Sequence, residues 1–144
     1  MLLSVHAAAT WLMFGVILIV QRVHYPLFSY VRTADYAAFQ AAHMRRITWI
    51  VGPAMTVELA TAGWIAWAPP PGLPPWGGWA GLALVLAIWG TTGLVQVPLH
   101  ARLIDGFDAA AHRRLVATNW LRTVAWALRA GLALWMLGHG AAAP

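Results

Sequence analysis

Four long apolar stretches constrain the fold of this chain more than any other feature of its sequence. They cover approximately residues 3–28, 48–68, 79–99 and 115–137. Each provides the ~20 residues that an α-helix needs to cross a hydrocarbon core of ~30 Å. Charged residues make up 9% of the chain, whereas a soluble domain has roughly 25%. The sequence therefore predicts one all-α domain over residues 1–144, an integral membrane four-helix bundle.

The arginines are distributed unevenly along the chain. Seven of the nine lie beside two polar connections, around residues 32–36 and 105–108. The third connection, residues 68–78, is rich in proline and carries no lysine or arginine, and the same holds for both ends of the chain. Because positively charged loops are retained in the cytoplasm, we expect both arginine-flanked connections there and both termini on the opposite side. The expected location is the bacterial inner (cytoplasmic) membrane.

The two halves of the sequence resemble each other. Residues 20–27 are similar to residues 95–100, and residues 39–46 are similar to residues 107–114. Each half is expected to form a helical hairpin, and two crossings return the chain to its starting side. The sequence therefore predicts two hairpins in a parallel internal repeat, related by an axis along the membrane normal.

Polar side chains gather toward the predicted cytoplasmic end of the bundle. Counting 1.5 Å per helical residue from the two turns places His24 and His43 at similar depth, with His100 slightly nearer the cytoplasm. Asn119 and Arg122 lie deeper in the last span. Groups with unmet hydrogen-bonding capacity are costly to expose to hydrocarbon. We therefore expect these five side chains to face one another inside the bundle.

Three of these side chains are histidines from different helices. Imidazole binds iron, copper and zinc, and three ligands leave one coordination position open for chemistry. His24, His43 and His100 are therefore candidate metal ligands, and bis-histidine haem ligation is a further option. The alternative is that they are interfacial histidines bonded to loop carbonyls or lipid headgroups. The cofactor stays open between none, iron, copper and haem.

Glu58 is the only acidic residue inside the apolar stretches. Arg129 lies at a comparable distance from its own turn, and His6 is expected at the same level. A lone charge in the middle of a bilayer costs at least ~2.5 kcal/mol, so such groups usually pair. We predict a Glu58–Arg129 ion pair. One interpretation is that the pair fixes the helix register and takes no part in chemistry.

Three segments resemble motifs of a known family. Residues 95–100 (Val-Gln-Val-Pro-Leu-His), 119–124 (Asn-Trp-Leu-Arg-Thr-Val) and 23–27 (Val-His-Tyr-Pro-Leu) are similar to landmarks of the anthrone-oxygenase-like family of small four-helix membrane proteins. Many members of that family are known only as a domain of unknown function. His100 stands where the family usually has asparagine. Fungal members are implicated in oxidising anthrones to anthraquinones, so the resemblance implies a hydrophobic phenolic substrate.

The resemblance also implies roles for individual residues. By motif match, Asn119 and Arg122 face the substrate, and His24 and His100 are candidate proton acceptors. An imidazole that titrates near neutral pH suits the deprotonation of a phenol or an activated C–H bond. These four residues are the expected catalytic set.

Three function classes stay open. The first is a membrane oxygenase or oxidoreductase that binds a lipophilic aromatic or quinone-like molecule in a polar pocket on the cytoplasmic side. The second is a metal- or haem-binding membrane protein, and the third is a non-catalytic small subunit of a larger membrane complex. The expected partners are membrane lipids, a lipophilic small molecule, and other membrane subunits or further copies of the chain. Nucleic acid is not an expected partner, because the arginines are scattered singly along apolar segments.

Overall fold

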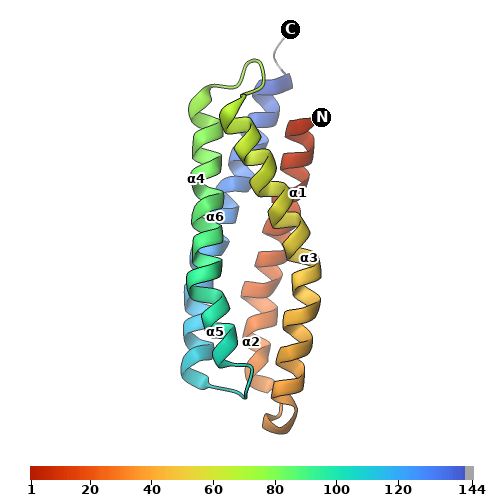
Figure 1. Cartoon of the computed structure of the whole chain (residues 1–144), viewed down its shortest axis with the longest axis vertical. Helices are drawn as coiled ribbons and strands as arrows, with labels where there is room; N and C mark the ends of the chain where they lie inside the picture. The colour runs from red at the N-terminus through yellow and green to blue at the C-terminus, as the bar shows by residue number, and fades with distance from the viewer. Residues whose placement is uncertain (142–144) are drawn as a thin grey trace.

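Four long helical rods make up the protein (Figure 1). The computed structural model describes residues 1–141. Residues 142–144, which belong to the predicted domain and the predicted outward C-terminus, lie outside the described residues. Consecutive rods run in opposite directions side by side, and no β-strand occurs within residues 1–141. The predicted all-α, four-helix architecture is confirmed.

The first rod contains a break in its α-helical hydrogen bonding. It begins with α1 (Leu2–Ile19), widens into the π-helix η1 (Val20–His24), and ends with α2 (Tyr25–Leu27) and the 3₁₀ turn η2 (Phe28–Tyr30). Pro26 follows the π-helix closely. Because proline has no N–H to donate to the preceding turn, the helix here departs from regular α geometry. π-Helical turns of this kind are frequent at functional sites.

The third rod repeats this arrangement. It consists of α4 (Pro75–Thr91), the π-helix η3 (Thr92–Gln96) and α5 (Val97–Arg102). Pro98 lies two residues after η3, and Pro26 lies two residues after η1. Both irregular segments occur in the half of the molecule near the two arginine-flanked connections.

The second and fourth rods are continuous α-helices, α3 (Thr33–Trp67) and α6 (Ala109–Ala141). The start of α6 is capped by Asp108, whose Oδ1 accepts hydrogen bonds from the backbone N–H groups of Ala110 (2.8 Å) and Ala111 (3.1 Å). This cap satisfies two donors that the first turn of a helix leaves without partners.

The helices enclose one interior between them. α1 and α4 each pack against both α3 and α6. Fully buried side chains from all parts of the chain fill the space, among them Met13, Phe28, Leu115 and Trp126. At the opposite end, α4 approaches α3 so closely that a Cβ on Gly78 would lie 2.8 Å from the carbonyl oxygen of Ile65. Only glycine permits that contact.

Two of the four helices are long and apolar enough to cross a membrane, Leu2–Tyr30 and Pro75–Arg102. The sequence predicts four such spans. α3 and α6 are less apolar because they carry the buried polar groups of the interior. These groups include Glu58 on α3, and Asn119, Arg122 and Arg129 on α6.

Candidate functional site

The five side chains predicted to face one another lie around one region of the interior. His43, His100, Asn119 and Arg122 are buried, and His24 is half-buried. They come from η1, α3, α5 and α6. The His43 ring lies 4.7 Å from that of His24 and 5.5 Å from that of His100, centroid to centroid. The structure thus brings the three histidines into one cluster.

His100 is held through both of its ring nitrogens. Its Nδ1 lies 2.9 Å from Nε2 of Gln40, and its Nε2 lies 2.9 Å from the hydroxyl of Tyr25. With the amide nitrogen of Gln40 as the donor to Nδ1, a neutral His100 carries its proton on Nε2 and donates it to Tyr25. His112 donates to the backbone carbonyl of Tyr25 at 2.8 Å and fixes this residue further. The hydroxyl hydrogen of Tyr25 is then available to the interior.

His24 and His43 bond directly to each other. Nε2 of His24 lies 2.8 Å from Nδ1 of His43. Within residues 1–141, no hydrogen bond reaches Nε2 of His43. Of the three predicted ligands, His43 is therefore the one that keeps an uncommitted nitrogen next to the interior.

The expected metal site is not supported by this arrangement. In residues 1–141, no group of three or more histidine, cysteine, aspartate or glutamate side chains is placed to hold a metal ion. Two imidazole nitrogens on one tetrahedral ion lie roughly 3.3 Å apart, because each metal–nitrogen bond is about 2 Å long. The His24–His43 contact of 2.8 Å is shorter than that and is a direct hydrogen bond, and both ring nitrogens of His100 already have partners. We derive no chemistry through iron, copper or haem.

Asn119 holds Arg122 in position and does not itself line the interior cavity. Its amide nitrogen donates to Oε1 of Gln21 at 2.9 Å, and its Oδ1 accepts from Nη1 of Arg122 at 3.1 Å. Gln21 is fixed in turn by its own donation to the backbone carbonyl of Val116 at 3.1 Å. This chain of bonds joins η1 to α6 and sets the position of the guanidinium.

Arg122 has unused hydrogen-bonding capacity. Its Nε is buried and has no partner, and neither has Oε1 of Gln96. The guanidinium carbon lies 5.1 Å from the centre of the Trp126 ring, a cation–π contact. Both unpartnered atoms belong to residues that line the same cavity.

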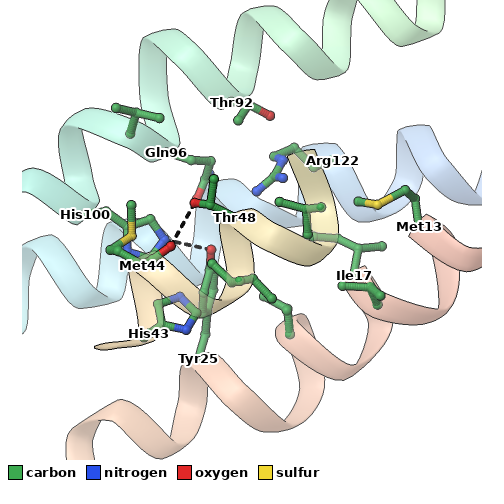
Figure 2. Close-up of a pocket in the computed structure, with 15 residues that line it drawn as sticks. Met13, Ile17, Tyr25, His43, Met44, Thr48, Thr92, Gln96, His100 and Arg122 are labelled. Atoms are coloured by element: carbon green, nitrogen blue, oxygen red, sulfur yellow. Dashed lines mark hydrogen bonds between the residues drawn. The ribbon is translucent and has the colours of Figure 1, made fainter. Parts of the chain in front are cut away.

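That cavity has a volume of about 110 Å³ and receives residues from all four rods. Figure 2 shows apolar Met13 and Ile17 at one end, His43 and His100 at the other, and Arg122 between them. Its apolar lining is Met13, Val16, Ile17, Val20, Met44, Ile47, Val51 and Val97. Its polar lining is Tyr25, His43, Thr48, Thr92, Gln96, His100 and Arg122.

The cavity opens sideways between two helices. Thr48 on α3 and Val97 on α5 line it and are also exposed. A second hollow, of about 230 Å³, lies on the outer side of the first and second rods and is lined by His24, His43 and Arg46 among others. His43 therefore borders both spaces, whereas His24 borders only the outer one.

The predicted ion pair lies elsewhere in the interior. Nη2 and Nε of Arg129 each lie 3.2 Å from Oε1 of Glu58, and both side chains are almost fully buried. Trp126 donates to Oε2 of Glu58 at 2.9 Å. His6 does not join the pair, and its Nδ1 contacts the hydroxyl of Thr61 at 2.7 Å. Both carboxylate oxygens of Glu58 are thus engaged by donors.

Sequence reasoning missed two members of the site. Gln40 is fully buried and orients His100, and Tyr25 presents its hydroxyl to the cavity. Gln40 precedes His43 by three residues, so both occupy one face of α3. That spacing was a usable signal. The role of Tyr25 depends on the π-helix before it, and Pro26 indicates irregular helix geometry there without giving the direction of the Tyr25 side chain.

No protein-family model, no curated protein and no solved structure matches this chain. The fold and the site define a class by geometry alone. It is an all-α protein of four antiparallel helices with a laterally open cavity that is apolar at one end and polar at the other.

Proposed function

We propose that all four helices cross a membrane, the bacterial inner membrane, with both termini outside. Large apolar side chains on the outer surface support this, such as Trp49 and Leu94, whose exposed fractions are 79% and 82%. Seven arginines are exposed near the two connections expected in the cytoplasm. They are Arg22, Arg32, Arg45, Arg46, Arg102, Arg113 and Arg114.

We propose further that the two hairpins are a parallel internal repeat. The first helix of each hairpin carries a π-helical segment that ends two residues before a proline, Pro26 in one and Pro98 in the other. The same irregularity at corresponding places supports a common origin of the two halves.

The function that we propose is oxidation of a lipophilic aromatic or quinone-like molecule, as the resemblance to the anthrone-oxygenase-like family implies. One observation carries this proposal, the cavity with apolar walls and a cluster of Tyr25, His43, Gln96 and Arg122 at its polar side. Its sideways opening suits a ligand that arrives through the lipid. Such a mix of apolar walls and few polar groups is typical of small-molecule sites.

The geometry supports a proposal with different roles from those expected by motif match. Arg122 and the Tyr25 hydroxyl are the donors that would hold a ligand oxygen. His43, with its uncommitted Nε2, takes the place of His24 and His100 as proton acceptor. His24 would pass the proton on to the outer hollow, and His100 orients Tyr25.

Anthrone is the probe that tests this activity. One anthrone and one O₂ give one anthraquinone and one water, so the oxidation needs no external reductant. We expect purified protein in lipid nanodiscs to accelerate O₂ uptake and anthraquinone formation over protein-free nanodiscs. His43→Gln keeps a hydrogen-bonding side chain but removes the base, and we expect it to slow turnover about 10²-fold, in the range typical for loss of a general base.

The control is His139→Gln, which changes an exposed histidine near the other end of α6. We expect it to match the unaltered protein. No acceleration by the unaltered protein, with the fold intact, would contradict the oxidase proposal and favour a non-catalytic subunit. Equal rates for both variants would remove His43 from the mechanism.

A further inference from the structure

Arg122 is a buried cation in the wall of the cavity, with an exposed fraction of 6%. We infer that the cavity binds a lipophilic molecule whose head is an anionic oxygen group, a carboxylate or a phenolate, with Arg122 as its counterion. The inference rests on the proposed function, which makes this cavity the ligand site. The new part is the negative charge of the ligand.

The carboxylates of the chain are all engaged or exposed elsewhere. The sequence contains four acidic residues. Glu58 contacts Arg129 at 3.2 Å, deep in the interior. The other three are exposed: Asp35, Asp105 and Asp108. Within residues 1–141 no acidic side chain forms an ion pair with Arg122. A cation in a low-dielectric interior normally has such a partner.

Arg129 provides an internal comparison, because it lies on the same helix seven residues later. Arg129 bonds a carboxylate through both Nε and Nη2. Arg122 has only neutral partners, the oxygen of Asn119, which it bonds through Nη1, and the hydroxyl of Tyr25, and its Nε has no partner. The Nε edge that Arg129 uses for Glu58 is therefore unused in Arg122. A carboxylate or phenolate oxygen is the complementary acceptor for such an edge.

The surroundings of Arg122 add further donors and no competing negative charge. The Tyr25 hydroxyl lines the same cavity, and its oxygen accepts from His100 in the tautomer derived above and lies within hydrogen-bond reach of Arg122. Its hydrogen can therefore be donated to an anionic oxygen of the ligand. The face of Trp126 stabilises the guanidinium in the absence of ligand.

Two sources could supply this anion, a small lipophilic acid or the phosphate of a phospholipid. A cavity of about 110 Å³ is smaller than the roughly 150 Å³ that encloses a benzene molecule. It has room for an acid head and part of the adjoining ring, with the remainder of the molecule passing through the opening between α3 and α5 into the lipid. We therefore favour the small acid.

The test uses a matched pair of probes, 4-octylbenzoate and its neutral counterpart 4-octylbenzamide. Binding is measured at pH 7.5 by calorimetry with the protein in phosphatidylcholine nanodiscs, against protein-free nanodiscs. We expect the unaltered protein to bind the benzoate at least about tenfold more tightly than the amide, since charge-assisted hydrogen bonds are about twice as strong as neutral ones. Arg122→Gln should abolish this preference, and Arg122→Lys should retain part of it. Arg113→Gln, which removes an exposed cation from the same helix, should leave it unchanged.

The outcomes distinguish failure of the anionic-head inference from failure of the proposed ligand site. Equal affinity of the unaltered protein for both probes would overturn the anionic head while leaving a lipophilic ligand in the cavity. Absence of binding by either probe would overturn both. Loss of benzoate binding when phosphatidylglycerol is added to the nanodiscs would assign the site to a lipid phosphate and overturn the small acid. The comparison of the two probes on the unaltered protein decides the question even if the Arg122 variants fail to fold.

Discussion

Trp126 donates a hydrogen bond from its indole nitrogen to Oε2 of Glu58 at 2.9 Å, and both side chains are fully buried. Trp126 also contacts a residue of the cavity wall, because the centre of its ring lies 5.1 Å from the guanidinium carbon of Arg122. One tryptophan therefore connects the buried ion pair to the candidate ligand site.

Trp126→Phe removes the donor to Glu58 but retains an aromatic ring. A hydrogen bond to a charged group contributes about 1.5–3 kcal/mol, so we expect a loss of stability of at least that order, measured by thermal unfolding in detergent. Trp64→Phe is the control, because Trp64 is exposed and should change little. Equal melting temperatures for both variants would show that the Trp126 hydrogen bond contributes nothing.

Neutralising either Glu58 or Arg129 alone should destabilise the protein. Glu58→Gln leaves a buried guanidinium without its counterion, and Arg129→Gln leaves a buried carboxylate. We expect a cost of about 3–5 kcal/mol for each single change, seen as lower melting temperatures in detergent. The double variant should recover part of this loss, because no uncompensated charge remains. Two single variants as stable as the unaltered protein would contradict the pairing.

Asp108 gives a pH dependence outside the segments that we propose to span the membrane. Hydrogen bonds from the backbone of Ala111 and Ala110 lower the pKa of its carboxyl from the ordinary value of 3.8. A lowered folded-state pKa means that the cap stabilises the protein fully above pH 3.8, and that this contribution is lost as the pH falls through the folded-state pKa.

The measurement compares unfolding of the unaltered protein with that of Asp108→Asn over this range. Asparagine caps a helix without titrating, and all other acidic residues are common to both proteins. We therefore expect the stability difference to shift in favour of Asp108→Asn as the pH is lowered below 3.8. A difference that does not vary with pH would contradict the role of the ionised cap.

The proposed topology is testable because the chain contains no cysteine. Single cysteines at Thr33 and Pro71 report on an arginine-flanked connection and on the proline-rich connection, and both positions are exposed. In intact cells, a membrane-impermeant thiol reagent should label Pro71→Cys and spare Thr33→Cys until the cells are opened. Labelling of Thr33→Cys from outside would invert the proposed orientation.

The helical architecture was predictable because apolar length and turn chemistry are local properties. The proximity of Glu58 and Arg129, and of His24, His43 and His100, was accessible by counting residues from the turns. Such counting gives depth along a helix but not the direction in which a side chain points.

The details of bonding could not be predicted for that reason. A metal site requires nitrogens that point at one centre, whereas His24 and His43 bond each other and His100 is held by Tyr25 and Gln40. The π-helix before Pro26 changes which way the following side chains point. The role of Tyr25 therefore depends on backbone geometry that propensity and periodicity do not contain.

The central claim is that a lipophilic ligand occupies the cavity between α3 and α5, and equilibrium binding of 4-octylphenol in nanodiscs tests it most directly. Thr48 and Thr56 provide matched variants, because both are exposed on α3 and both donate to the carbonyl four residues earlier. Only Thr48 lines the cavity. The account predicts that Thr48→Phe obstructs the opening and weakens binding at least about tenfold, while Thr56→Phe binds like the unaltered protein. Binding unaffected by Thr48→Phe, or no binding above that of protein-free nanodiscs, would contradict it.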